Sequence, residues 1–205
     1  MSREEAAKRR EGNEIEFSRI VAFSDGVFSI AITLLVLNLL IPKAEVDGGV
    51  GQAVWDEREN FLSYAISFAV IGRFWLVHHR FFGEVTAFDG RLIGLNMLYL
   101  GFIVLIPFSS SVLGDFSGTT AVVVYAVNLS VVVMIGLWMT ADAYRAGLTS
   151  TDATTQREGM VRASYIAAVF LISIPVAFFA PVVAQLMWLI LFFDPTDWIV
   201  ARSAS

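Results

Sequence analysis

The stretch RIVAFSDGVFSIAITLLVLNLLI, from Arg19 to Ile41, decides the fold of this chain. It is longer than the roughly 20 apolar residues that a helix needs to cross a bilayer. From residue 27 onward it contains only three polar side chains, those of Ser29, Thr33 and Asn38. A charged side chain inside lipid costs about 2.5–3.5 kcal/mol on insertion scales, so Asp25 is expected to face protein or water and to have a partner. The stretch therefore predicts a transmembrane helix with a polar site near its start.

The composition of the whole chain indicates an all-α, polytopic membrane protein. Of its 205 residues 57% are hydrophobic and 16% are charged, and the mean hydropathy is +0.69, whereas soluble domains carry roughly 25% charged residues. The chain has no cysteine, which excludes disulfides, thiolate metal sites and cysteine nucleophiles. The net charge of −5 argues against nucleic acid as a partner.

Six apolar stretches are expected to span the membrane. They cover about residues 19–41, 61–82, 92–113, 119–141 and 163–180, with a shorter sixth stretch from 181 to 194. Residues 1–18 are interpreted as a cytoplasmic arm or short helix, residues 19–194 as the six-helix domain, and residues 195–205 as a cytoplasmic tail. Residues 43–59 and 142–162 are predicted to be polar connections.

The distribution of basic residues predicts the orientation of these spans. With the N-terminus inside, only Lys43 and Arg58 lie in outer loops and Arg73 lies within the second span, so the other eleven of the 14 lysines and arginines are cytoplasmic. An excess of positive charge in cytoplasmic segments is the normal pattern. Both termini are therefore predicted to be in the cytoplasm.

This orientation brings the polar residues of the first three spans to one depth, near the cytoplasmic side. Polar groups in lipid need partners, so a single hydrogen-bonded network is expected, in which Asp25 accepts from a histidine, from Asn96 or from an arginine. The residues assigned to this network are Arg19, Phe23, Ser24, Asp25, Trp75, His78, His79 and Asn96.

The first helix also has a distinct apolar face. At 100° per residue, Leu34 and Leu37 lie within about 40° of Ile30, and Thr33 lies about 60° away. Asp25 lies about 140° from Ile30, nearly on the opposite side. Periodicity alone leaves open whether this face meets lipid, a neighbouring subunit or a central axis. On an axis, a hydrophobic ring can conduct when wetted and block when dewetted.

The sequence resembles one family of channels. The residues that carry the resemblance are Arg19-x-x-x-Phe23-Ser24-Asp25-Gly26-Val27-Phe28-Ser29-Ile30-Ala31-Ile32-Thr33-Leu34-Leu35-Val36-Leu37, then Trp75-Leu76-Val77-His78-His79-Arg80, Asn96 and Pro107-Phe108. They are similar to the signature of the transmembrane protein 175 potassium channels, in their short prokaryotic form. The resemblance covers nearly the whole chain, but its motifs lie in the first three spans.

This resemblance implies a homotetramer in which the first helix of each subunit lines the pore. It implies that Ile30, Leu34 and Leu37 form the constriction, with Thr33 as a pore-side hydroxyl. Arg19 and Asp25 would hold the helix bundle together without touching the ion. The expected function is a potassium-preferring cation channel in a bacterial cell membrane, which is not an enzyme, has no cofactor or resident metal, and holds potassium only in transit.

The sequence lacks both the Thr-Val-Gly-Tyr-Gly filter of ordinary potassium channels and the spaced arginines of a voltage sensor. Any selectivity is therefore expected to be modest and to come from the apolar constriction and nearby dipoles. Asn38 is expected near the outer vestibule, where an amide attracts cations less strongly than a carboxylate.

Three other functions remain open at this point. A proton-coupled or proton-conducting transporter would use Asp25 with His78 or His79, because histidine titrates near neutral pH; the absence of an internal repeat argues against it. A non-conducting membrane scaffold is a weaker alternative. A Ser24-Asp25-histidine hydrolase is disfavoured because neighbouring residues on a helix diverge.

Overall fold

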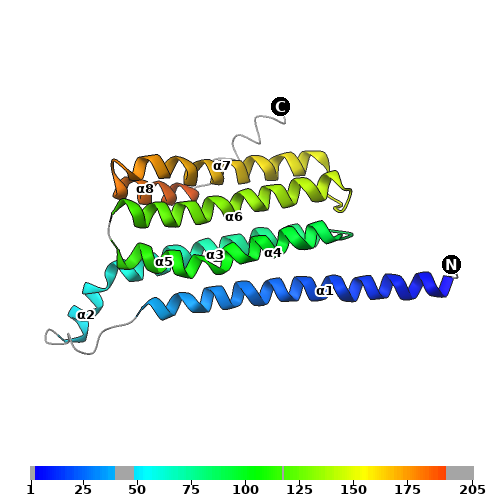
Figure 1. Cartoon of the computed structure of the whole chain (residues 1–205), viewed down its shortest axis with the longest axis horizontal. Helices are drawn as coiled ribbons and strands as arrows, with labels where there is room; N and C mark the ends of the chain where they lie inside the picture. Colours follow the sequence, from blue (N-terminus) through cyan, green and yellow to red (C-terminus); the bar gives the residue numbers. More distant parts are fainter. Residues whose placement is uncertain (1–2, 40–48, 117, 193–205) are drawn as a thin grey trace.

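A computed structural model describes residues 3–39, 49–116 and 118–192, with side chains from residue 14 onward except those of 189 and 192. The described part is helical apart from its connections (Figure 1). Its elements are α1 (Arg3–Leu34), η1 (Leu35–Asn38), α2 (Val50–Asp56), α3 (Arg58–Glu84), α4 (Gly90–Val104), α5 (Ile106–Asp115), α6 (Thr119–Arg145), α7 (Ala153–Ala177), α8 (Pro181–Met187) and η3 (Trp188–Phe192).

Five segments of the described chain are long and apolar enough to cross a membrane, in agreement with the first five predicted spans. They are Glu14–Asn38, Arg58–Glu84, Gly90–Asp115, Thr119–Arg145 and Ala153–Ala177. The described part of the predicted sixth span is divided between α8 and η3, of 7 and 5 residues. Its predicted end and the predicted tail, residues 195–205, lie outside the described residues, as does Pro42.

The element boundaries differ from the expected ones in three places, one of which is the helix α2 within the predicted connection 43–59. The predicted arm is a helical extension of the first span, because α1 begins at Arg3 and projects past the other helices (Figure 1); alanine, glutamate, lysine and arginine all favour helix. The predicted connection 142–162 is shorter, because α7 starts at Ala153. Asp152 caps it, with Oδ1 accepting from the backbone N–H groups of Thr154 and Thr155 at 2.8 and 3.0 Å.

The third span is broken into two helices near its outer end. α4 ends at Val104 and α5 begins at Ile106, with Pro107 in its first turn. Proline has no backbone N–H and its ring clashes with the preceding turn, so the helix cannot continue unchanged. The break lets α5 lean against α3, where Gly114 permits close approach: a Cβ at that position would lie 2.0 Å from the Asn60 Oδ1.

The helices form layers with α1 at one side of the molecule and α7 with α8 at the other (Figure 1). α6 lies between them and supplies the centre of the core, with Val122, Tyr125, Leu129 and Val132 fully buried. At the end of the molecule where α3 leads into α4, the α3–α4 connection pairs with the α6–α7 connection. There the backbone N–H of Thr86 donates to the Leu148 carbonyl at 2.8 Å. α1 is thus an outer helix that packs on its neighbours from one side.

Candidate functional site

The two faces of α1 have opposite environments. Ser24, Phe28, Ala31 and Leu35, spaced by three or four residues, are at most 1% exposed and pack toward α3, α4 and α5. On the other side, Ile30, Leu34 and Leu37 are 58%, 37% and 60% exposed. The sequence-predicted apolar face is therefore turned away from the body of its own subunit.

A change of helix type aligns the outer part of this face. α1 ends at Leu34 and continues as the 3₁₀ helix η1 from Leu35 to Asn38. Side chains three residues apart eclipse one another in a 3₁₀ helix, so Leu37 follows Leu34 more directly than a regular wheel predicts. The Asn38 side chain turns away from the apolar face, because its Nδ2 donates to the Pro107 carbonyl at 3.1 Å. Asn38 thereby ties the end of the helix to α5.

Thr33 lies on the exposed side next to the apolar face. Its hydroxyl donates to the Ile30 carbonyl of the preceding turn at 2.8 Å. Because this bond uses the hydroxyl proton, the oxygen keeps lone pairs that can accept from a donor or face a cation. Thr33 thus supplies an oxygen dipole among otherwise apolar side chains.

The buried face of α1 is tied to α3 and α4 by a short chain of hydrogen bonds. Asn96 Nδ2 donates to Ser24 Oγ at 3.0 Å, and Ser24 Oγ donates to the Ile20 carbonyl at 3.0 Å. The Oδ1 of Asn96 pairs with His78 Nε2 at 2.8 Å. An amide oxygen only accepts, so this bond places the proton on His78 Nε2. We call Ser24, Asn96 and His78 the brace.

Asp25 has a different partner from those expected. Trp75 Nε1 donates to Asp25 Oδ1 at 2.9 Å, in place of a histidine, Asn96 or an arginine. His79 stacks on the Trp75 ring with centroids 5.4 Å apart, so Trp75 contacts both Asp25 and that histidine. The indole N–H is a donor with no acceptor function, so the Asp25 oxygen is the acceptor of this bond. The sequence signal for this pair was that Asp25 and Trp75 are predicted to lie at the same depth in the membrane.

Two residues assigned to the network stand outside it. Arg19 is exposed, and within the described residues it forms no ion pair with Asp25. Phe23 is 54% exposed. Conversely, Phe28 was not assigned to the network, although its ring lies edge-on to His78 at 5.3 Å and is almost fully buried. Its position four residues after Ser24 on the buried face was the available signal.

Sequence reasoning also missed a buried group of hydroxyls in the outer half of the bundle. Ser67 Oγ lies 2.8 Å from Ser110 Oγ and 2.9 Å from Tyr125 Oη, and Ser63 Oγ donates to the Ser110 carbonyl at 2.7 Å. These bonds join α3, α5 and α6. The four-residue spacing of Ser63 and Ser67 in an apolar span was the sequence signal.

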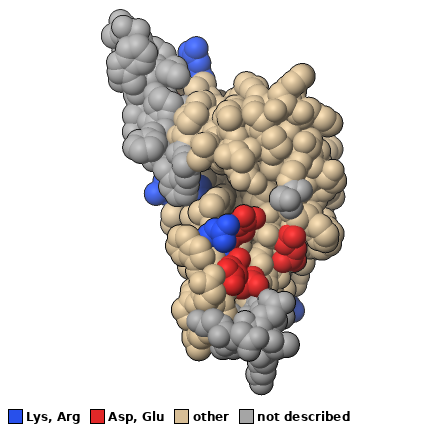
Figure 2. All heavy atoms as spheres, turned by 90° about the vertical axis from the view of Figure 1, so that its left-hand side faces the viewer, with Lys and Arg blue, Asp and Glu red and all other residues tan. Residues whose placement is uncertain are grey.

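Acidic side chains gather at the end of the molecule where α2 and α5 lie (Figure 2). The described acids in these elements and at the start of α3 include Asp56, Glu59 and Asp115. Among the described residues, no group of three or more histidine, aspartate or glutamate side chains is arranged to hold a metal ion. Arg58 lies among these acids, with its guanidinium 3.8 Å from the Glu59 carboxylate.

Comparisons with known proteins agree on one family. The sequence profile described as "Endosomal/lysosomal potassium channel TMEM175" matches residues 19–107. A potassium channel of Chamaesiphon minutus is 35% identical over 159 residues, covering 69% of this chain and 77% of the relative. A potassium channel of Streptomyces collinus is 41% identical over 101 residues, and this alignment spans 49% of each chain.

An animal relative and two solved structures extend this likeness. The chicken protein named "Endosomal/lysosomal proton channel TMEM175" is 33% identical over 139 residues, 60% of this chain and 28% of its own length. The crystal structure of the TMEM175 homologue from Chamaesiphon minutus matches with a TM-score of 0.76 and 26% identity, over 93% of this chain and 99% of that chain. A variant of the potassium channel MtTMEM175 in complex with a nanobody fusion matches with a TM-score of 0.62 at 20% identity, over 91% and 92% of the two chains, which shows the fold alone.

Proposed function

The chain belongs to the TMEM175 channel family, and from this premise we propose that it is a potassium-preferring cation channel. In this proposal four copies assemble around an axis, and the α1 helix of each lines the pore. Ile30, Leu34 and Leu37 form the constriction. The activity is conduction, with potassium as the permeant ion and no bound cofactor.

The observation that carries the proposal is the exposed apolar face of a helix whose rotation is fixed. The brace and the bond between Trp75 and Asp25 hold α1 on its polar side, while Ile30 and Leu37 remain more than half exposed. Four such faces around an axis give a narrow apolar passage, which blocks when it dewets and conducts when it is wetted. Thr33 adds an oxygen dipole at the same level, and we assign to it part of the preference for potassium.

The charge distribution supports cation entry from the outer side. The basic residues favour a cytoplasmic N-terminus, which puts the acidic end formed by α2 and α5 outside (Figure 2). Negative charge near a channel mouth raises the local cation concentration. The named prokaryotic relatives favour the plasma membrane of a bacterial cell as the location.

A flux measurement tests the constriction. Purified protein in liposomes should pass potassium, and Leu34→Ser should increase the flux and reduce the preference for potassium over sodium, because a hydroxyl eases wetting. Leu171→Ser on α7 is the control, since Leu171 is 44% exposed but lies on the far side of the molecule. Equal flux and equal selectivity in both variants would contradict the assignment.

Crosslinking tests the assembly separately. Because the chain has no cysteine, Leu37→Cys gives a single thiol per subunit. A disulfide requires Cα atoms about 4.4–6.8 Å apart, so oxidation should give covalent dimers if the α1 helices meet at an axis. Monomers alone in an oxidised, conducting sample would show that Leu37 does not face another copy.

Proton conduction is a second candidate, because vertebrate relatives are named proton channels. The titrating chain expected for it is interrupted here: Asp25 pairs with Trp75, and His78 pairs with Asn96. The same liposomes with an internal pH dye distinguish the two activities. Acidification that persists without potassium and is lost in Asp25→Asn would favour proton conduction.

A further inference from the structure

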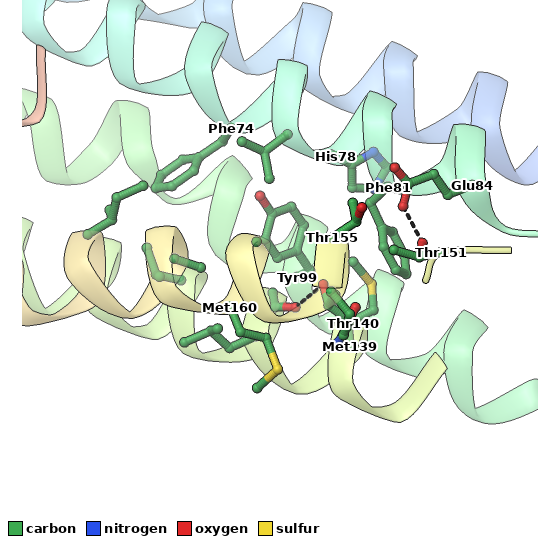
Figure 3. A pocket seen from close by; sticks show the side chains of 18 of the residues that line it. Phe74, His78, Phe81, Glu84, Tyr99, Met139, Thr140, Thr151, Thr155 and Met160 are labelled. Carbon is green, nitrogen blue, oxygen red and sulfur yellow. Dashed lines mark hydrogen bonds between the residues drawn. The ribbon is translucent and has the colours of Figure 1, made fainter. Parts of the chain in front are cut away.

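A cavity lies between α3, α4, α6 and α7, on the side of the subunit away from the exposed face of α1 (Figure 3). Its volume is about 200 Å³. Apolar side chains form most of its wall, among them Phe74, Val77, Phe81, Leu137, Met160 and Ile166. The proposed conduction pathway does not use this cavity.

Tyr99 brings an unsatisfied hydroxyl into the cavity. The residue is 4% exposed, and Figure 3 shows its hydroxyl pointing into the space between the helices. Among the described residues this hydroxyl has no hydrogen-bond partner, whereas the equally buried Tyr125 bonds to Ser67 at 2.9 Å. Its oxygen faces the cavity space, where water or a ligand can supply the hydrogen bond that the described protein groups do not. Such a group favours a molecule that supplies the missing bond.

The Tyr99 ring is held so that its hydroxyl cannot turn elsewhere. His78 stacks on the ring with centroids 5.6 Å apart and an interplanar angle of 21°. Gly136 of α6 makes room for the ring edge, since a Cβ there would lie 3.3 Å from Tyr99 Cε2. One face and one edge of the ring are therefore packed, which holds the hydroxyl at the cavity.

Other polar groups of the cavity divide into satisfied and free ones. Thr140 Oγ1 donates to the Gly136 carbonyl at 2.9 Å, and Thr151 Oγ1 donates to a Glu84 carboxylate oxygen. The Gln156 carboxamide has no side-chain hydrogen bond among the described residues, although the residue is only 8% exposed. The charged side chains of Arg73 and Glu84 also line the cavity, and Tyr99 and Gln156 are the neutral groups that form no side-chain hydrogen bond among the described residues.

The cavity is reachable from the membrane. Its exposed lining residues are Arg73 and Val77 of α3 and Thr155 and Gly159 of α7, so the cavity opens between these two helices. A second hollow of about 250 Å³ shares Arg73, Phe74 and Ile166 with it and continues along α3 and α7. A molecule dissolved in the hydrocarbon core can enter sideways without crossing the pore.

We propose that this cavity is a binding site for a small, neutral, membrane-soluble phenol or aryl alcohol. An apolar cavity of about 150 Å³ binds benzene, so 200 Å³ accommodates one ring with a small substituent. The wall is mostly apolar and its two charged side chains, Arg73 and Glu84, have opposite signs, so the cavity favours a neutral ligand. The ligand hydroxyl bonds to Tyr99, and its ring packs among Phe74, Val77 and Ile166.

The position of the site links its occupancy to α1. Tyr99 stacks on His78, His78 pairs with Asn96, and Asn96 donates to Ser24 of α1. A ligand that contacts Tyr99 therefore also acts on the brace, from the side away from α1. This regulatory part rests on the proposed channel function, whereas the binding part does not.

Binding is tested with two probes that differ by one hydroxyl, 4-fluorophenol and fluorobenzene, followed by fluorine NMR on the full chain in detergent. 4-Fluorophenol should bind saturably, and Tyr99→Phe should weaken it about 2- to 10-fold, as expected for one hydrogen bond. Fluorobenzene should bind wild type and Tyr99→Phe equally. Ala163→Phe, which fills the cavity, should abolish both, whereas Ala168→Phe on the exposed side of α7 should change neither.

Three outcomes would overturn the proposal. No saturable binding of 4-fluorophenol would mean that the cavity holds only water. Binding that survives Ala163→Phe would place the site elsewhere. Equal binding of both probes in wild type, unchanged by Tyr99→Phe, would indicate a site for an apolar lipid chain. Because no flux is measured, these results do not depend on whether the chain conducts potassium.

Discussion

The brace gives the sharpest test of what holds α1 in place. Asn96 is fully buried and makes two hydrogen bonds, to His78 at 2.8 Å and to Ser24 at 3.0 Å. Asn96→Leu keeps the approximate volume but leaves the His78 Nε2–H without an acceptor. It also removes one bond from Ser24, which still donates to the Ile20 carbonyl.

These losses set the expected size of the effect. An unsatisfied buried donor costs about 1–3 kcal/mol and a lost neutral hydrogen bond about 1 kcal/mol, which gives about 2–4 kcal/mol together. For a chain of this size the midpoint of thermal unfolding should fall by roughly 5–15 °C. The measurement is thermal unfolding of the purified protein in detergent, and potassium flux in liposomes should become leakier in the same variant.

Asn128→Leu is the matched control. Asn128 is also buried, but it makes one bond, of 3.2 Å to Ser109, and its Oδ1 has no partner in the described part. Replacing it should be nearly neutral, because the loss of one bond is offset by removal of an unsatisfied oxygen. If the unfolding midpoint falls no more in Asn96→Leu than in Asn128→Leu, the brace does not stabilise the position of α1.

A double variant separates the hydrogen bond from general disruption. His78→Phe with Asn96→Leu replaces both partners by apolar groups and leaves neither of them unsatisfied. The combined loss should therefore be at least about 1 kcal/mol smaller than the sum of the single losses. Strict additivity would show that the two side chains do not stabilise α1 through their mutual bond.

Two further predictions concern other parts of the fold. Gly114→Ala should destabilise by about 1–3 kcal/mol because its Cβ would meet Asn60 of α3, whereas Gly101→Ala, with nothing within 4 Å, should be neutral or stabilising; equal unfolding midpoints would contradict this. Backbone N–H bonds from Thr155 lower the pKa of Asp152, so its stabilising effect should be complete above about pH 4 and fade as pH falls through the lowered pKa. The difference in unfolding midpoint between wild type and Asp152→Ala should shrink correspondingly in acid. A difference that stays constant with pH would show that the charge of the Asp152 carboxylate does not stabilise the helix.

Hydropathy predicts most of the fold, and local chemistry explains where it fails. The central spans are apolar over their full length, so lipid solvation alone identifies them. The start of α7 was missed because its first seven residues, 153–159, include no large apolar side chain, and the Asp152 cap that begins it is a local signal. The helical arm from Arg3 was missed as a continuous helix because charged residues carry no apolar period.

The depth of the candidate site in the membrane was predictable from the sequence, but its hydrogen-bond partners were not. Orientation from basic residues brought Ser24, Asp25, Trp75, His78 and Asn96 to one depth. The structure joins Ser24, Asn96 and His78 in one chain of hydrogen bonds and Asp25 with Trp75 in a separate bond, in place of the single network expected. Which donor reaches Asp25 depends on helix rotation and rotamer, which one sequence does not specify. The Tyr99 cavity depends on four helices at once, so no single segment indicates it.

The central claim, that the apolar face of α1 lines the ion pathway, is tested most directly by thiol modification during flux. In the cysteine-free chain, Ile30→Cys and Ile172→Cys place single thiols at isoleucines of similar exposure, 58% on α1 and 54% on α7. A methanethiosulfonate reagent should stop potassium flux through Ile30→Cys and leave Ile172→Cys unchanged. Undiminished flux through fully modified Ile30→Cys would contradict the account.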